Sequence, residues 1–176
     1  MFYREAGQFK TSYGADQAIF PIAQDRWFVI ALVALALITR LWSVLQPKDI
    51  VFDEVYFKVF AGHYLDGRYF FDIHPPLAKL LFAGWAWLIH LPASELLTGS
   101  AVMLRYLPAI AGILLIPVFW ALLRRLGASR PFALLGAAAL LLDNALTVES
   151  RFILMDSMLL LFGIGALWAY LGARQA

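Results

Sequence analysis

The sequence has no cysteine, few charged residues and no low-complexity linker. Without cysteine, disulfide bonds and metal sites built from thiolates are excluded. Charged residues make up 15% of the 176 residues and the net charge is +2, so the composition does not indicate a nucleic-acid partner. Apolar residues are in excess, at 62% with a mean hydropathy of +0.76. Because soluble domains contain about 45–50% apolar residues, we expect an integral membrane protein.

Four segments are apolar over a length that suits membrane-spanning helices, which need about 20 such residues. They cover residues 27–45, 106–123, 131–148 and 152–171. The first begins late, is long and has no small-residue cleavage site, so we interpret it as a retained signal anchor. The expected fold is therefore all-α, with four transmembrane helices in one domain over residues 27–172.

A fifth apolar segment, residues 77–91, is shorter and contains Lys79. Cytoplasmic loops collect Lys and Arg. The basic residues before the first span, those at 124–130 and Arg174 all fall on the cytoplasmic side only if this segment does not cross. We therefore predict that it is an interfacial helix, that residues 1–26 form a cytoplasmic N-terminal segment, and that residues 46–105 form one outer loop.

The first half of this outer loop predicts an amphipathic juxtamembrane helix. From Val51 to Tyr64, apolar residues recur in pairs every four positions, which is the spacing of a helical stripe. Gly67 follows as a suitable C-cap. Asp53 and Glu54 then lie at the start of a helix on the membrane surface, close to the end of the first span.

Two short motifs of the outer loop carry groups suited to catalysis. A carboxylate such as Asp53 can take a proton from an attacking hydroxyl in a partly dehydrated cleft, or it can simply cap the helix that follows. His74 precedes Pro75 and Pro76, which can start a helix. That helix N-terminus, with His74, can receive a phosphate, or the motif is a plain helix-start turn.

Charged residues at the predicted outer ends of the spans are further candidates. Arg105 can clamp a lipid phosphate or can extend its side chain to the membrane surface without a specific role. Asp156 lies about one turn inside the fourth predicted span, and an acidic residue at mid-depth in a span costs roughly 2.5–3.5 kcal/mol. It either serves a site or forms a structural network, for example with Arg151. The predicted topology brings all these groups to one membrane face.

Several motifs together resemble those of protein O-mannosyltransferases. The matching runs are residues 52–57 (FDEVYF), 69–81 (YFFDIHPPLAKLL), the pair Asp143-Asn144 and residues 149–160 (ESRFILMDSMLL). Arg105 before an apolar segment ending in two arginines fits as well. The resemblance extends from about Trp27 to the C-terminus. It implies a membrane glycosyltransferase of the GT-C class that moves mannose from a polyprenyl or dolichyl phosphate to Ser or Thr of secreted proteins, with inversion.

The resemblance also implies a role for each candidate residue. Asp53 matches the catalytic base, and Glu54 matches its partner, which shapes the acceptor site. His74 and Arg105 match residues near the donor phosphate. Arg151 and Asp156 match a later motif that supports the site. Neither a metal nor another cofactor is expected.

The resemblance further implies what the chain works with. We expect a lipid-phosphate-linked sugar donor, a secreted or membrane protein as acceptor, surrounding membrane lipids and an active face that is not cytoplasmic, at the plasma membrane if the protein is prokaryotic. The family's full enzymes have more spans, so the chain is expected to be an N-terminal fragment, with a partner chain as one source of the missing spans. Tyr56 and Lys58 stand where many members have His and Gly, which leaves the acceptor and the subfamily open.

Three other functions stay open from the sequence. The first is a non-catalytic or split half of a transferase that binds a lipid phosphate or a partner subunit. The second is a related enzyme that glycosylates a lipid such as lipid A. The third is a transporter fragment, which ranks last because the acidic residues gather at one face and no inverted repeat is evident.

Overall fold

The computed structural model describes residues 22–175, and all the regular secondary structure in that range is helical. Most of the predicted cytoplasmic segment 1–26 therefore lies outside the described residues. The helices, in chain order, are α1 Ile22–Leu41, α2 Glu54–Asp66, α3 Pro76–Leu88, α4 Ala93–Thr98, the 3₁₀ helix η1 Val102–Arg105, α5 Tyr106–Arg125, α6 Arg130–Leu142, α7 Asn144–Glu149 and α8 Asp156–Gln175.

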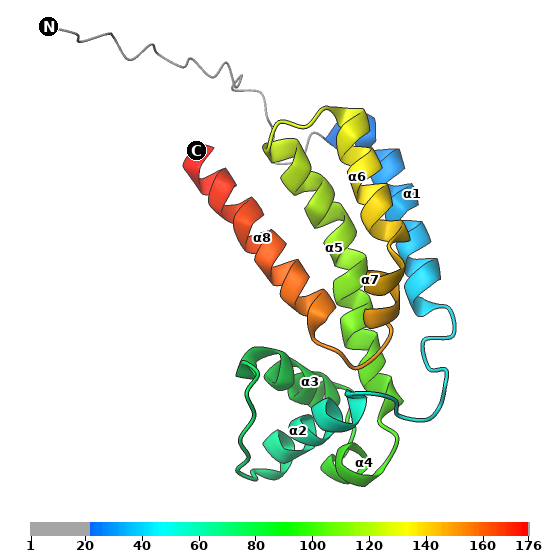
Figure 1. Ribbon diagram of the computed structural model, residues 1–176, viewed down its shortest axis with the longest axis vertical. Helices are drawn as coiled ribbons and strands as arrows, with labels where there is room; N and C mark the ends of the chain where they lie inside the picture. Colours follow the sequence, from blue (N-terminus) through cyan, green and yellow to red (C-terminus); the bar gives the residue numbers. More distant parts are fainter. Residues whose placement is uncertain (1–21, 176) are drawn as a thin grey trace, which may run out of the picture.

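Helices α1, α5, α6 and α8 form an elongated bundle around α5 (Figure 1). Ile116 and Trp120 of α5 are buried against α1 and α6, where Ala36 and Ala137 are fully buried. Such small residues let helix backbones approach closely, as is common between helices in membranes. Helix α8 contacts α5 but otherwise leans away from α1 and α6, and its lower half meets the outer loop.

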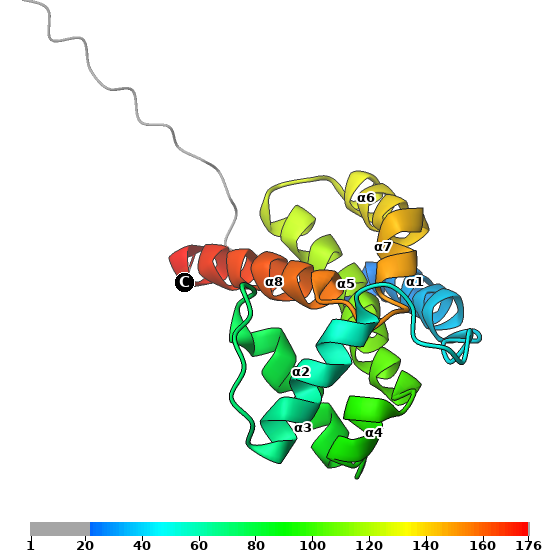
Figure 2. The ribbon, with the colours of Figure 1, turned by 60° about the horizontal axis from the view of Figure 1, so that its bottom comes forward.

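The predicted outer loop, residues 46–105, contains a second group of helices, α2, α3 and α4, at one end of the bundle (Figures 1 and 2). Phe57, Phe82 and Leu96 form its core, and Ile153 and Met158 join that core from the start of α8. Gly67 ends α2 in the left-handed region, with φ 66°, and its N–H bonds to the His63 carbonyl. The predicted helix and its glycine cap are thus confirmed.

Two described helices are long and apolar enough to cross a membrane by length and composition. They are Val102–Arg125, with 24 residues and a hydropathy of 2.2, and Asp156–Arg174, with 19 residues and a hydropathy of 1.4. The first extends the predicted span 106–123 by one turn at its start. Helix α3, with 13 residues, covers most of the segment 77–91 that is predicted to be an interfacial helix, and α1 ends at Leu41, four residues before the predicted end.

The prediction of a single helix over residues 131–148 is wrong, because the helix is interrupted at Asp143. Residue 143 leaves the helical region, with φ −61° and ψ 120°, and its carboxylate accepts a hydrogen bond from the Leu146 N–H. Asp143 therefore caps α7 as a separate short helix. The span predicted from residue 152 also starts late, at Asp156, so Asp156 is the first residue of α8 and does not lie one turn inside it.

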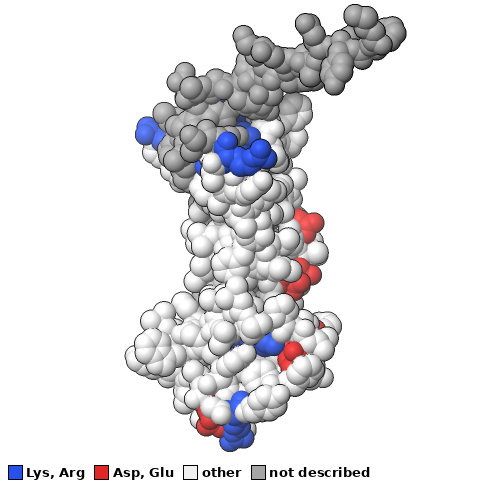
Figure 3. All heavy atoms as spheres, turned by 90° about the vertical axis from the view of Figure 1, so that its left-hand side faces the viewer, with Lys and Arg blue, Asp and Glu red and all other residues white. Residues whose placement is uncertain are grey.

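Basic residues gather at the end of the bundle remote from α2–α4. The ends of α5, α6 and α8 that carry Arg125, Arg130 and Arg174 all lie there. Arg130 pairs with Asp25 of α1, and the Arg125 guanidinium lies 4.1 Å from the ring centroid of Trp168. Figure 3 shows Lys and Arg at this end and charges of both signs at the other. The charge-based prediction grouped these arginines on one side of the membrane, and they do share one end of the fold.

Candidate functional site

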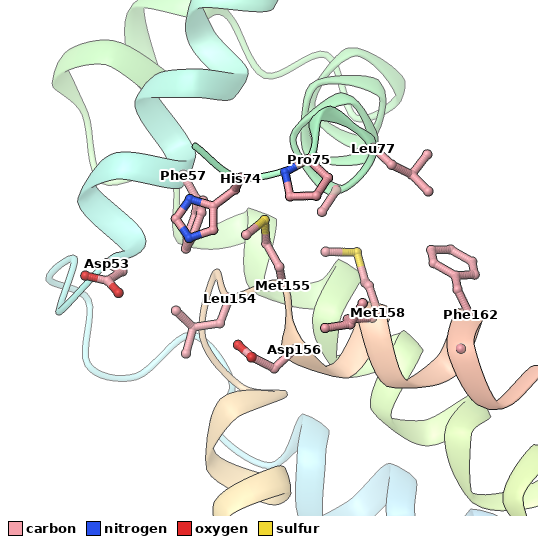
Figure 4. A pocket seen from close by; sticks show the side chains of 13 residues that line it. Asp53, Phe57, His74, Pro75, Leu77, Leu154, Met155, Asp156, Met158 and Phe162 are labelled. Atoms are coloured by element: carbon pink, nitrogen blue, oxygen red, sulfur yellow. The ribbon is translucent and has the colours of Figure 1, made fainter. Parts of the chain in front are cut away.

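A cavity of about 490 Å³ lies where the α2–α4 group meets the start of α8 (Figure 4). Its walls come from the residue before α2, from the start of α3 and from α8 with the turn before it. The lining residues are Asp53, Phe57, His74, Pro75, Leu77, Ala78, Leu154, Met155, Asp156, Met158, Leu159, Phe162 and Gly163. Most are apolar, and the polar groups are Asp53, His74 and Asp156, three residues that the sequence singled out.

Asp53 immediately precedes α2, and its side chain is exposed in the cavity. It makes no capping hydrogen bond to the helix, so the structure does not show the plain capping role. Phe52 before it has a positive φ of 50°, which is uncommon for a bulky residue and costs roughly 1–3 kcal/mol. The Asp53 carboxylate therefore lines the cavity without a hydrogen bond to any described residue of the protein.

His74 lies on the opposite side of the opening from Asp156 (Figure 4). Its Nδ1 is 3.2 Å from each carboxylate oxygen of Asp72, and its ring packs edge-on against Phe57 with centroids 5.7 Å apart. Pro76 is the first residue of α3, as the His-Pro-Pro motif predicted. His74 is therefore held at the N-terminus of a helix, beside the cavity.

The Asp72 carboxylate contacts both the Lys79 ammonium and the His74 ring. The buried Lys79 ammonium lies 2.6 Å from Asp72 Oδ2 and also donates to the His74 carbonyl at 2.9 Å. The hydrogen bond from Lys79, and then that from His74, hold the pKa of Asp72 at about 2, so its carboxylate is anionic at neutral pH. The sequence analysis did not predict this ion pair. Asp72 and Lys79 are seven residues apart, and the start of α3 between them brings the two side chains together.

Asp156 begins α8, where a carboxylate interacts favourably with the helix dipole. Ser157 anchors this end of the helix by donating to the Pro108 carbonyl of α5 at 3.0 Å. Glu149 at the end of α7 interacts electrostatically with Asp156 and Asp143. The adjoining ends of α6, α7 and α8 thus bring three carboxylates near one another.

Arg151 lies apart from the main cavity. Its guanidinium donates to the Trp42 carbonyl at 2.7 Å, which ties the turn after α7 to the end of α1. It lines a second, smaller cavity of about 300 Å³ with Gln46, Val148 and Phe152. Among the described residues no ion pair joins Arg151 to Asp156, so the structural pairing considered for them does not form.

Glu54 and Arg105 form an ion pair whose side chains are both 0% exposed. Arg105 Nε lies 2.7 Å from Glu54 Oε1, and its second terminal nitrogen lies 2.7 Å from Oε2, which is the bidentate geometry that arginine favours. The guanidinium also donates to the carbonyls of Pro47 at 2.6 Å and Asp49 at 2.9 Å. Arg105 is thus occupied by the protein itself.

The Glu54 carboxylate accepts two further bonds, from the Val51 N–H at 3.0 Å and the Ile153 N–H at 2.8 Å. One side chain therefore joins the chain before Asp53 to the turn before Asp156. Neither Glu54 nor Arg105 lines the cavity. Their geometry favours holding the two acidic residues in place over contact with a substrate.

Within the described part of the chain, no three His, Asp or Glu side chains are arranged so that they could hold a metal ion. The cavity instead combines carboxylates, an imidazole and an apolar wall. Such an arrangement suits proton transfer to or from a hydroxyl next to a molecule with an apolar part.

A protein-family model described as dolichyl-phosphate-mannose-protein mannosyltransferase matches residues 30–176. The chain belongs to this mannosyltransferase family. The family relative named dolichyl-phosphate-mannose--protein mannosyltransferase 4 of Schizosaccharomyces pombe is 35% identical over 151 residues, which are 80% of this chain and 19% of the relative. Protein O-mannosyltransferase 1 of Drosophila melanogaster is 35% identical over 165 residues, 89% of this chain and 19% of the relative.

A solved family structure has the same fold as this chain. It is the Saccharomyces cerevisiae protein O-mannosyltransferase Pmt1-Pmt2 complex bound to the sugar donor, with a TM-score of 0.80 and 30% identity. The likeness covers 86% of this chain and 22% of the solved chain. The chain therefore spans about one-fifth of the length of the mannosyltransferases it matches.

Proposed function

We propose that this chain takes part in the transfer of mannose from a polyprenyl or dolichyl phosphate to Ser or Thr hydroxyls of secreted proteins. The observation that carries the proposal is the cavity that brings Asp53, His74 and Asp156 together from separate stretches of the chain. Family membership supports it, since the relatives are named for this reaction and the solved yeast complex is described as bound to the sugar donor.

In the proposed reaction Asp53 is the general base. Its carboxylate accepts the proton of the acceptor hydroxyl while the hydroxyl oxygen bonds to the anomeric carbon of mannose. The bond between that carbon and the phosphate oxygen breaks on the opposite face, and the lipid phosphate leaves with the electron pair. The anomeric configuration is therefore inverted. Asp53 suits this role because it is exposed in the cavity and has no protein partner there.

The donor fits the cavity in a definite direction. The first turn of α3 offers backbone N–H groups that the helix itself does not use, and the protonated ring of His74 offers a further donor to the lipid phosphate. Met158, Leu159 and Phe162 of α8 give the lipid chain an apolar wall. Asp156, at the junction of the polar and apolar parts, is placed to accept a hydrogen bond from a sugar hydroxyl.

Glu54, Arg105 and Arg151 act in this proposal mainly through the position of other residues. Glu54 holds the acceptor side by bonding both to Arg105 and to the turn before α8. Arg105 reaches the donor phosphate only by giving up a buried bond, so we assign it to support of the site. Arg151 keeps the turn that leads to Asp156 against α1.

We place the cavity on the non-cytoplasmic face, with α1, α5, the α6–α7 pair and α8 as four spans. The shared basic end of α5, α6 and α8 supports this orientation. Much of α8 is apolar and exposed, including Leu159, Leu167 and Tyr170. A partner chain or further spans of the family architecture would cover this surface, and the acceptor is a secreted or membrane protein.

The test replaces the proposed base. Asp53→Asn keeps the shape of the side chain but removes its basicity, and transfer should fall by at least about 100-fold. The assay uses membranes containing this chain, polyprenyl-phosphate-mannose and a Ser/Thr-rich peptide. Asp66→Asn, at the exposed end of α2 and outside the cavity, is the matched control and should retain transfer.

Two outcomes contradict the proposal. Near-normal transfer by Asp53→Asn would remove Asp53 from the mechanism. Donor binding by the unmodified chain without any transfer would favour the non-catalytic half that binds lipid phosphate.

A further inference from the structure

We propose that Asp72 and Lys79 are positioning residues that hold His74 with a proton on Nδ1 and with Nε2 presented to the cavity. The inference rests on the proposed function, because it assigns a role to groups beside the proposed donor site. Neither Asp72 nor Lys79 lines the cavity, so both would act only through His74.

The ring of His74 contacts both the Asp72 carboxylate and the Phe57 ring. Both Asp72 oxygens lie 3.2 Å from Nδ1, and the His74 backbone N–H also approaches Asp72, at 3.4 Å. A carboxylate has only lone pairs to offer, so Nδ1 must carry the proton to form this bond. The Phe57 ring packs against the imidazole and limits its rotation.

The Asp72 carboxylate is itself held by Lys79. For this role its carboxylate must stay ionised and fixed, and Lys79 supplies both conditions. The Lys79 side chain is 3% exposed, its ammonium lies 5.3 and 5.7 Å from the ring centroids of Phe60 and Phe70, and it contacts Asp72 at 2.6 Å. The hydrogen bond from Lys79 is the largest cause of the lowered pKa of Asp72, at about 2.

The bond at Nδ1 determines which nitrogen His74 presents to the cavity. Nδ1 and Nε2 lie on different edges of the imidazole, so engaging Nδ1 leaves Nε2 for a bound molecule. A neutral ring held this way accepts a hydrogen bond at Nε2, for example from a sugar hydroxyl. When the ring is protonated, Nε2 donates to a phosphate oxygen. A carboxylate behind a histidine sets the working nitrogen in this way at many catalytic and metal sites.

The position of the proton can be measured directly by nitrogen NMR. The chain is labelled with ¹⁵N-histidine, placed in lipid nanodiscs and studied at a pH where the ring is neutral. His74→Gln assigns the signals by removing them, and His63 and His90 serve as internal references. We expect the His74 proton on Nδ1 in the unmodified chain. A proton on Nε2 would overturn the inference.

Two paired variants separate positioning from folding. Asp72→Ala with Lys79→Met removes the acceptor without leaving a buried charge unpaired, and His74 should move to the Nε2–H form that an unrestrained histidine prefers. Asp72→Asn with Lys79→Met keeps a carbonyl acceptor and should retain Nδ1–H. Unchanged His63 and His90 signals report an intact fold. If the first pair leaves Nδ1 protonated in an intact fold, the inference is wrong.

Transfer measurements connect the geometry to the reaction. The Ala/Met pair should raise the donor concentration for half-maximal transfer by about tenfold, the lower end of what losing a histidine's orienting partner costs at metal sites. The Asn/Met pair should recover part of this loss. Asp66→Ala with Arg68→Met, an exposed ion pair in the same loop, is the control and should change neither readout.

The two levels of the proposal fail separately. No transfer by the unmodified chain contradicts the proposed function but leaves the NMR result to decide the position of the proton. Normal donor dependence in the Ala/Met pair, with transfer otherwise intact, contradicts the positioning role alone.

Discussion

Asp53 and Glu54 are neighbours in sequence but occupy opposite environments. Glu54 is fully buried and its two oxygens accept bonds from Arg105, Val51 and Ile153. Asp53 is exposed and makes no capping bond. Because a helix begins between them, one carboxylate faces the core and the other faces the cavity. Only Asp53 is therefore free to exchange a proton with a bound molecule.

The buried pair should dominate the stability of the site. Arg105→Met leaves the Glu54 carboxylate buried without a cation, which should lower the free energy of unfolding by about 3–5 kcal/mol. Adding Glu54→Gln removes that charge and should restore part of the loss. Denaturant titration in detergent, followed by circular dichroism, measures both.

Arg68→Met is the matched control for Arg105→Met. Arg68 pairs with Asp66 at an exposed position, where losing an ion pair costs less than about 1 kcal/mol. If Arg68→Met and Arg105→Met lower the free energy of unfolding equally, the buried Glu54–Arg105 pair contributes no more to stability than an exposed pair.

The sequence anticipated the three cavity residues but not the way in which their neighbours hold them. Asp53, His74 and Asp156 stand beside helix starts, and charge placement alone predicted that they share one face. The Glu54–Arg105 pair joins residues 51 positions apart. No local pattern reports such a contact, so Arg105 looked like a free cation. Burial of its side chain, which only the fold reveals, changes its expected role.

At the scale of helices, hydropathy predicted that the elements exist but not where all of them break. The start of α3 at Pro76 and the end of α2 at Gly67 follow from backbone preferences that those residues carry themselves. The break at Asp143 follows from a single side-chain bond within an apolar run. Averaged hydropathy does not detect it, which is why residues 131–148 looked like one span.

Gly112 marks a close approach between α5 and its neighbours. A Cβ added there would lie 2.7 Å from Ser150 Cβ and 3.0 Å from Arg40 Nε. We expect Gly112→Ala to lower the free energy of unfolding by about 1–3 kcal/mol, because both neighbours are buried and must shift. The same detergent titration measures the change.

Gly84 provides the comparison for Gly112. It lies within α3, and a Cβ there would meet nothing within 4 Å. Gly84→Ala should stabilise the chain by about 0.5–1 kcal/mol through its higher helix preference. A neutral Gly112→Ala would mean that the contact with Ser150 is loose.

The whole molecule has two chemically different ends. Arginines gather at one end of the bundle, and the cavity with its carboxylates lies toward the other. The central helix α5 connects them with 20 residues, about the length that crosses a bilayer. In the proposed topology, this arrangement puts the proposed chemistry at a membrane surface and not at mid-depth.

The absence of cysteine makes the orientation simple to test. Ser100→Cys, beside α4, should react with a membrane-impermeant maleimide added to intact cells. Leu126→Cys, at the basic end after α5, should react only after the membrane is permeabilised. Labelling of both from outside would place the two ends on one side and contradict the four-span topology.

The bond from Glu54 to the Ile153 N–H has a consequence for how a donor arrives. It connects the residue after Asp53 with the turn before Asp156, so it opposes separation of these two parts of the chain. The flank beside Phe162 and Gly163 lies beyond this connection, on the apolar side of α8. In the proposed reaction, a lipid-linked sugar would therefore enter the cavity laterally from the bilayer, with its lipid tail remaining in the hydrocarbon.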